Sequence, residues 1–167
     1  DPDLVGALHD NYQDIYARCR SFPRGVTRLP SGAAFFGGLW AGGQAYMICS
    51  REALAYARRN WDLMRPLAPR GMFIDTTTAA HLYECYHPDH PLTRADDERY
   101  KLELLRFYKG QGLVLGSEET RDFGVPVWMR SSVETMTMGE LHAGAGIGTR
   151  SMLFLKQLHE RDIRVTV

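Results

Sequence analysis

The sequence predicts an α/β fold, and within that class a partial or truncated (β/α) barrel of the TIM type. Two short apolar segments, residues 71–75 and 112–118, each end on a carboxylate, and apolar side chains recur at helical spacing between them. Strands that alternate with helices are typical of a parallel sheet covered by helices. The chain has 167 residues, whereas a complete barrel of this type needs about 250. We therefore expect residues 1–167 to form one domain that is a fragment of such a barrel.

The first predicted strand, residues 4–8, is apolar and leads into a polar segment, residues 9–14. A buried strand that runs out into a ligand-facing loop has this pattern. A second interpretation needs no ligand, because Asp10 or Asn11 could cap a helix that continues to Arg20.

Residues 21–43 are rich in glycine and proline, which predicts a long irregular connection. This connection carries aromatic side chains, among them Phe35, Phe36 and Trp40, whose flat apolar faces suit the C–H faces of a sugar. Alternatively, these rings anchor the connection on the core. Residues 45–49 follow as a short buried strand.

The next predicted helix begins at Ser50, which can cap it, and ends before Pro66. A helix in this place completes a β-α-β unit with residues 45–49 and 71–75 as its parallel strands. A second unit follows, in which Thr93 and Asp96 resemble a capping box at the start of a helix that Gly110 ends.

Residues 128–167 are atypical of the pattern before them. The segment with Gly144, Gly146 and Gly148 is predicted to be a loop, because it lacks the spacing of a phosphate-binding loop. A last helix over residues 151–160 and a last strand over residues 162–167 are expected after it.

The composition limits the classes of partner. Lys plus Arg and Asp plus Glu both number 20, so the formal net charge is zero and no field would attract nucleic acid. No apolar run is long enough for a membrane span, and the first ten residues lack a signal-peptide pattern. Cytoplasmic and secreted locations both stay open, as does the oligomeric state. The three cysteines are widely spaced and do not indicate a disulfide framework.

Asp75 and Glu118 are the candidate catalytic pair, because each ends a predicted strand. Parallel strands deliver their carboxyl ends to one edge of a sheet, and two neighbouring carboxylates there suit glycoside hydrolysis. In a retaining mechanism one is the nucleophile and the other the acid/base. A purely structural interpretation is that Asp75 holds the loop of residues 76–78 and that Glu118 pairs with Arg121.

A competing chemistry is metal binding by the loop between these acids. His81, Cys85, His87 and His90 lie within ten residues, and His and Cys are favoured zinc ligands. Their spacings match no usual zinc motif, however, and Cys85 could equally fill a buried apolar position. A metal-dependent hydrolase is therefore only the third hypothesis, and we expect no metal and no cofactor.

Several blocks of the sequence, in order, resemble a bacterial glycoside hydrolase family. They are HDNYQD (residues 9–14), GLWAGGQAY (38–46), FIDTTTA (73–79), ECYHPDHPLTRADD (84–97) and GLVLGSEETRDFGVP (112–126). The family is similar to endo-α-N-acetylgalactosaminidases and, more distantly, to α-galactosidases, and the resemblance covers about residues 9–127.

This resemblance implies a (β/α)₈ catalytic barrel and retaining hydrolysis of α-linked galactose-type sugars. It also implies that Asp75 is the nucleophile and Glu118 the acid/base. A carbohydrate is the expected partner, and a non-catalytic carbohydrate-binding module is the alternative function. The expected substrate-binding residues are His9, Asp10, Tyr12, Trp40, Gln44 and Asp122.

Overall fold

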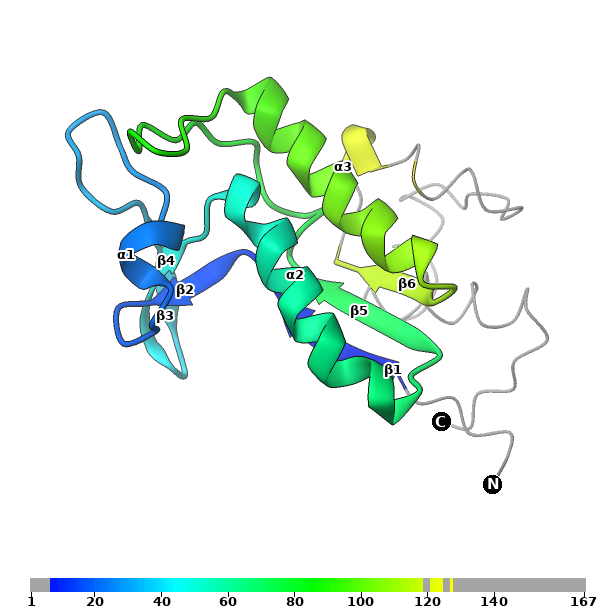
Figure 1. Ribbon diagram of the computed structural model, residues 1–167. Coiled ribbons are helices and arrows are strands. Elements are labelled where there is room, and N and C mark those ends of the chain that lie inside the picture. Colours follow the sequence, from blue (N-terminus) through cyan, green and yellow to red (C-terminus); the bar gives the residue numbers. More distant parts are fainter. Residues whose placement is uncertain (1–6, 119–120, 125–126, 128–167) are drawn as a thin grey trace, which may run out of the picture.

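The computed structural model describes residues 7–118, 121–124 and 127, which form two three-stranded sheets and three helices, with two short 3₁₀ turns at Arg65–Leu67 and Asp122–Gly124. The two sheets lie at opposite ends of the described region (Figure 1). One is parallel and carries the candidate acids, and the other is antiparallel. The predicted loop, helix and strand of residues 128–167 lie outside the described residues.

The parallel sheet has the order β1 (Ala7–Asn11), β5 (Gly71–Asp75) and β6 (Val114–Ser117). Two helices, α2 (Ser50–Met64) and α3 (Arg94–Gly110), pack side by side over one face of this sheet (Figure 1). The chain therefore passes from β1 through α2 to β5 and then through α3 to β6. Successive parallel strands joined by helices are the repeating unit of (β/α) folds.

The antiparallel sheet is inserted between β1 and α2. It has the order β2 (Asp14–Tyr16), β4 (Gly43–Met47) and β3 (Phe36–Trp40), and the short helix α1 (Phe22–Gly25) lies between β2 and β3. The register between β3 and β4 shifts between Phe36 and Gly38. Such a bulge bends a strand and re-aims its side chains.

This insertion corrects three predictions. The strand expected at residues 45–49 pairs with β2 and β3 instead of joining the parallel sheet, so β1 is the strand that precedes α2 in the β-α-β unit. The alternative helix running to Arg20 is wrong, because β1 continues to Asn11 and β2 spans Asp14–Tyr16. The connection of residues 21–43 is also not wholly irregular, since it contains α1 and β3.

The α/β class is confirmed, but the described residues contain no closed barrel. The TIM-type barrel and the single-domain organisation therefore stay predictions. Among the described residues, no helix has both the length and the apolar character to cross a bilayer.

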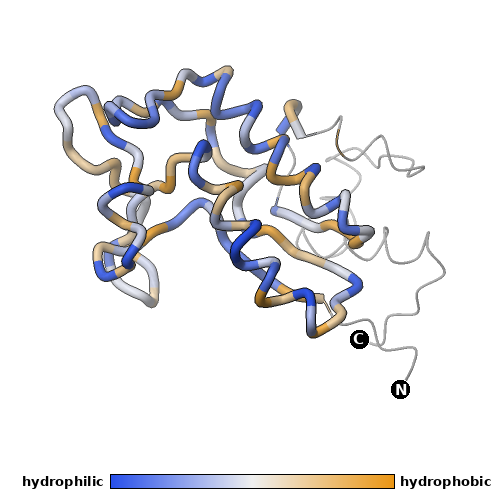
Figure 2. Tube along the Cα trace, viewed as in Figure 1, coloured by the Kyte–Doolittle hydropathy of each residue, from blue (hydrophilic) through white to orange (hydrophobic). Residues whose placement is uncertain are grey.

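The main core lies between the parallel sheet and its two helices, where apolar residues of β5 and α3 meet (Figure 2). The predicted capping box of α3 is confirmed, since Asp96 N donates to Thr93 Oγ1 and Thr93 N to Asp96 Oδ2. The largest fully buried side chains here are Met72, Ile74, Leu104, Leu105 and Tyr108. Burying each such side chain contributes about 1.5–3 kcal/mol, so this core fixes the strand ends that carry the acids.

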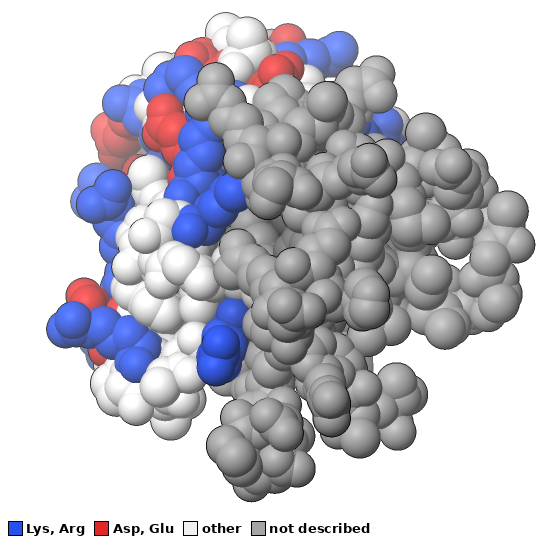
Figure 3. All heavy atoms as spheres, turned by 90° about the vertical axis from the view of Figure 1, so that its right-hand side faces the viewer, with Lys and Arg blue, Asp and Glu red and all other residues white. Residues whose placement is uncertain are grey.

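The start of α2 differs in detail from the prediction. Cys49 occupies the N-cap position, and Ser50 is the first helical residue. The Ser50 hydroxyl is buried and has no hydrogen-bond partner among the described residues. Both acidic and basic side chains lie on the described surface visible in Figure 3.

Candidate functional site

The carboxyl edge of the parallel sheet brings together Asn11, Asp75 and Glu118. The register pairs Asn11 of β1 with Asp75 of β5, and Ile74 with Ser117 of β6. Glu118 directly follows Ser117, so its backbone is next in line to Asp75 at the same edge. Adjacent strands lie about 4.8 Å apart, so the register brings the two predicted acids to neighbouring strand ends.

Asn11 links two carboxylates at this edge. Its Nδ2 donates to Asp14 Oδ2 at 3.2 Å and makes a longer contact of 3.4 Å to Asp75 Oδ2. Its Oδ1 accepts the backbone N–H groups of Gln13 and Asp14, at 2.7 and 3.0 Å. Both ends of the Asn11 side-chain amide are therefore fixed. Its oxygen closes a local turn of the kind that Asn favours, and its N–H groups face the two carboxylates.

Trp40 joins the same cluster through Asp14. Burial raises the pKa of the Asp14 carboxyl above its usual value, while hydrogen bonds from Asn11 and Trp40 oppose that rise and the charge of Asp75 adds to it. The Trp40 side chain is nonetheless 55% exposed. A Trp ring that is held by its N–H and open to solvent can serve as a stacking surface.

Gly38 sets the position of this ring. It has φ +147°, and a Cβ there would lie 2.6 Å from Trp40 Cζ2. Any side chain would therefore collide with the indole as well as strain the backbone. Gly38 allows Trp40 to fold back over its own strand.

The residue that follows Asp75 has a strained backbone. Thr76 has φ 54°, in the left-handed region that β-branched residues rarely adopt. Its buried hydroxyl has no hydrogen-bond partner among the described residues, and Thr77 N closes a tight turn onto Asp75 O at 2.6 Å. Strain of this kind concentrates at functional sites, where the surrounding fold enforces it.

Asp10 and Tyr12 were predicted to face substrate, but they lie against the helices. Asn60 of α2 donates to Asp10 Oδ2 at 3.0 Å, and the Tyr12 hydroxyl bonds both Asp10 and the Tyr108 hydroxyl of α3. Tyr12 is buried, and burial followed by the Asp10 hydrogen bond raises its pKa. Burial also raises the pKa of Tyr108 to about 12. These contacts support a structural role for Asp10 and Tyr12.

The other predicted binding residues are dispersed. His9 stacks on Phe73, with ring centroids 5.3 Å apart, on the strand pair that carries Asn11 and Asp75. Gln44 donates to the Tyr46 hydroxyl at 2.5 Å on the antiparallel sheet. Asp122 begins a short 3₁₀ turn, but its side chain lies outside the described part of the chain.

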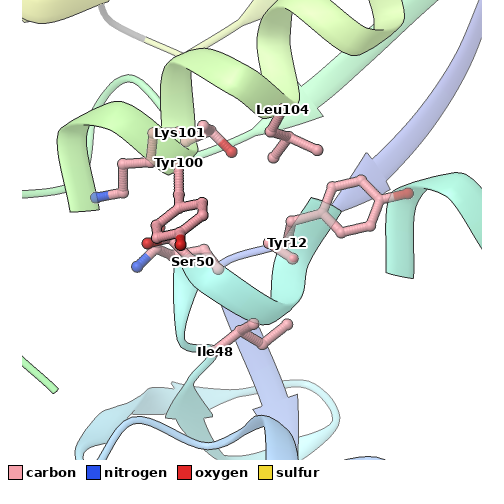
Figure 4. Close-up of a pocket in the computed structure, with 9 residues that line it drawn as sticks. Tyr12, Ile48, Ser50, Tyr100, Lys101 and Leu104 are labelled. Carbon is pink, nitrogen blue, oxygen red and sulfur yellow. The ribbon is translucent and has the colours of Figure 1, made fainter. Parts of the chain in front are cut away.

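A small cavity between α2, α3 and the segment that follows β1 does not offer a binding site (Figure 4). Its volume is about 10 Å³, which is roughly the space for one water. Its lining includes Tyr12, Ser50, Tyr100 and Lys101, which belong to the packed interior. Two open hollows, of about 570 and about 410 Å³, lie over the loop of residues 81–93, and Asp75 lines neither of them.

That loop brings two of the four predicted metal ligands together and separates the others. Cys85 Sγ lies 3.5 Å from His90 Nδ1, and Cys49 joins them, with the three ligand atoms within 4.8 Å of one another. His81 instead contacts the Arg121 guanidinium, and the His87 ring stacks on His90. Cys49 was missed because it lies far away in sequence, beside α2. A hydrogen bond from Cys49 and backbone N–H groups lower the pKa of Cys85 to about 5.

The comparisons with known proteins agree with the resemblance at a general level. The chain is similar to an α-N-acetylgalactosaminidase, NagBb from Bifidobacterium bifidum, solved as a GalNAc complex. The match has a TM-score of 0.69 and 31% identity over 74% of this chain and 20% of the NagBb chain. The ligand-free form matches with a TM-score of 0.69 and 26% identity over 90% of this chain and 26% of that one.

A third NagBb structure, a Gal-NHAc-DNJ complex, gives a TM-score of 0.69 and 26% identity over 91% of this chain. The chain spans only 20% to 26% of the length of these structures. No protein-family model and no curated protein matches it. The chain is thus similar in sequence and fold to part of a glycoside hydrolase.

Proposed function

We propose that this chain carries the catalytic pair of a retaining glycoside hydrolase that acts on α-linked galactose-type sugars. The observation that carries the proposal is the parallel register, because it brings Asp75 and the residue before Glu118 to neighbouring strand ends. Similarity to NagBb, which was solved in complex with GalNAc, supports an α-galactoside or α-N-acetylgalactosaminide as substrate.

In the proposed reaction Asp75 attacks the anomeric carbon while Glu118 donates a proton to the departing glycosidic oxygen. A covalent glycosyl–enzyme forms, and Glu118 then takes a proton from the water that releases the sugar. Two displacements return the original anomeric configuration. The mechanism requires carboxylates about 5–5.5 Å apart, a separation that adjacent strands about 4.8 Å apart can supply.

Asn11 and Trp40 have supporting roles in this proposal. The Asn11 amide at Asp75 Oδ2 restricts rotation of the carboxylate. The exposed Trp40 ring offers a stacking surface for the sugar on the sheet next to the acids. Asp14 connects the two, because it accepts hydrogen bonds from both side chains.

The test uses Asp75→Ala and Glu118→Ala in the complete protein with an aryl α-galactoside and an aryl α-N-acetylgalactosaminide. Both variants should lose turnover, and azide should restore it to Asp75→Ala with formation of a glycosyl azide of inverted configuration. Asp62→Asn is the matched control, because Asp62 is an exposed carboxylate on α2. Full activity in both alanine variants would refute the assignment.

A second candidate, a non-catalytic carbohydrate-binding module, rests on a different observation. The antiparallel sheet exposes Phe36, Leu39 and Trp40, with 57%, 73% and 55% of each side chain accessible. Calorimetry separates the two functions. A binding module should bind galactose-type sugars without turnover, lose binding with Trp40→Ala and keep it with Asp75→Ala.

A further inference from the structure

We propose that Cys49, Cys85 and His90 form a zinc site that holds the loop of residues 81–93 against α1 and α2. The three side chains are 0%, 2% and 1% exposed. Their ligand atoms lie within 4.8 Å of one another although Cys49 is remote from the other two in sequence. Two sulfurs and one imidazole nitrogen form a donor set that zinc favours. This inference is independent of the proposed glycosidase activity.

The spacing of the donor atoms suits a tetrahedral ion. Zn–S bonds of about 2.3 Å and Zn–N bonds of about 2.0–2.1 Å, at the tetrahedral angle, place sulfur and nitrogen about 3.5 Å apart. Cys85 Sγ and His90 Nδ1 are separated by 3.5 Å. The separation of this pair therefore matches that of two ligands of one ion, and Cys49 supplies the third ligand.

The imidazole is held in the orientation and tautomer that a metal needs. His90 Nε2 lies 2.5 Å from the backbone carbonyl oxygen of Arg24, so Nε2 carries the proton and donates it to that oxygen. Nδ1 is then unprotonated, and it lies next to Cys85 Sγ with its lone pair available to a metal. Metal-binding histidines usually donate their second ring N–H to a carbonyl or carboxylate in this way.

The sulfurs also have partners that suit ligands. The Arg28 backbone N–H donates to Cys85 Sγ at 3.5 Å, and the Arg51 backbone N–H donates to the Cys49 side chain. N–H groups directed at sulfur stabilise the negative charge that a bound thiolate carries. Cys49 in addition occupies the N-cap of α2, where the helix dipole favours an anion.

Backbone hydrogen bonds hold the loop in place before any metal binds. Cys85 and Leu92 exchange two of them at 2.9 Å each, and Tyr86 N donates to Arg28 O at 2.9 Å. Cys49 N donates to Gly25 O at 2.8 Å, which fixes the third ligand to α1. Three separate segments thus converge on one point, where a zinc ion would replace weak S–H hydrogen bonds by metal–ligand bonds.

One of the three ligands, Cys85, lines an open hollow. The hollow of about 570 Å³ over this loop is lined by Cys85, His87 and Leu92, so an ion can arrive through it and a water can complete the coordination. The role that we propose for the ion is to join Cys49 at the start of α2 to Cys85 and His90 of the loop.

The test measures zinc in the complete protein purified without chelator from zinc-supplemented medium. We expect about one zinc ion per chain in the wild type. Each of Cys49→Ser, Cys85→Ser and His90→Gln should weaken zinc affinity about 100-fold or more, since loss of an outer partner alone costs 10- to 100-fold. Cys19→Ala and His81→Gln are matched controls, a cysteine and a loop histidine outside the ligand set, and both should retain zinc.

A second measurement uses only the wild type, so it tests the proposal even if the ligand variants do not fold. Zinc should protect the thiols of Cys49 and Cys85 in the wild type from alkylation, and removing it with a chelator should speed their alkylation, while Cys19 reacts equally in both states. Cobalt added to the zinc-free protein should produce a thiolate-to-cobalt charge-transfer band. A wild type that contains no zinc and gives no cobalt band, or that links Cys49 to Cys85 as a disulfide, would overturn the proposal.

Discussion

Neighbouring polar residues at the end of β1 point to opposite faces of the strand and have different surroundings. Asn11 faces Asp75 at the open edge of the parallel sheet, whereas Asp10, its neighbour in sequence, faces Asn60 under the helices. The open side has a strained turn at Thr76 and an exposed indole. The helix side has a buried, mutually hydrogen-bonded network around Tyr12. Because side chains alternate along a strand, a polar run at a strand end contains both site and scaffold residues.

The largest expected effect separates the two faces by activity. Asp75→Asn should lower kcat/KM on the order of 10⁴-fold or more, because it removes the proposed nucleophile, while the melting temperature should hardly change. Asp10→Asn should instead lower the melting temperature clearly and change kcat/KM little, because it disrupts the hydrogen bonds of Asp10 with Asn60 and Tyr12. Steady-state kinetics and thermal unfolding of both variants test this difference. If the two substitutions changed kcat/KM and the melting temperature equally, the two faces of β1 would not have separate roles.

The next effect concerns positioning of the nucleophile. Asn11→Ala should lower kcat about 10- to 100-fold, because the Asp75 carboxylate loses the amide that orients it and small misplacements are costly. Asn60→Ala, the matched amide deletion on the helix face, should reduce stability instead. The measurement is kcat and KM for each variant beside urea unfolding. A kcat loss in Asn60→Ala larger than that in Asn11→Ala would contradict the assignment.

A smaller effect tests the buried network alone. Tyr108→Phe removes the hydroxyl that lies 2.6 Å from the Tyr12 hydroxyl and should lower the free energy of unfolding by about 1–3 kcal/mol, since a buried partner loses a hydrogen bond. Urea unfolding measures this change. Activity per folded molecule should stay within about 3-fold of the wild type, as expected for a surface that substrate does not reach. A stability equal to that of the wild type would show that the network is dispensable.

The smallest expected effect is a pH dependence centred on Asp14. Its folded-state pKa is raised, chiefly by burial, so between the unfolded and folded pKa values the folded state holds more protons. Stability contributed by this group therefore falls as pH rises from about 4. Asp14→Asn removes that loss, and its melting temperature should improve relative to the wild type as pH rises through this window. A difference that stays constant or moves the opposite way would contradict the raised pKa.

The sequence predicted the parts of the fold whose signals are local. The capping box at Thr93 lies where the pattern indicated, and the apolar runs of residues 71–75 and 112–118 contain the strands β5 (Gly71–Asp75) and β6 (Val114–Ser117). The antiparallel sheet could not be foreseen from the same signals. Its β3 strand contains Gly37 and Gly38, residues that normally mark loops, and nothing local tells which of two sheets a buried strand joins.

The candidate site was predictable only in part for a related reason. Asp75 and Glu118 could be chosen as candidates because each ends a predicted strand, but the separate environments of Asp10 and Asn11 depend on which face each side chain takes. That depends on how far β1 extends, and the sequence pattern ended this strand at Leu8 whereas β1 continues to Asn11. Cys49 had no local signal at all, since only the tertiary fold brings it to Cys85 and His90.

The most direct test of the central claim is covalent trapping of the nucleophile in the complete protein. An activated fluorinated α-galactosyl inactivator should label one residue, and peptide mass mapping should place the label on Asp75, with protection by a competing galactose-type sugar. Glu118→Gln should slow labelling less with a leaving group that needs no protonation than with one that does. Turnover that inverts the anomeric configuration, or a label on any residue other than Asp75, would contradict the account.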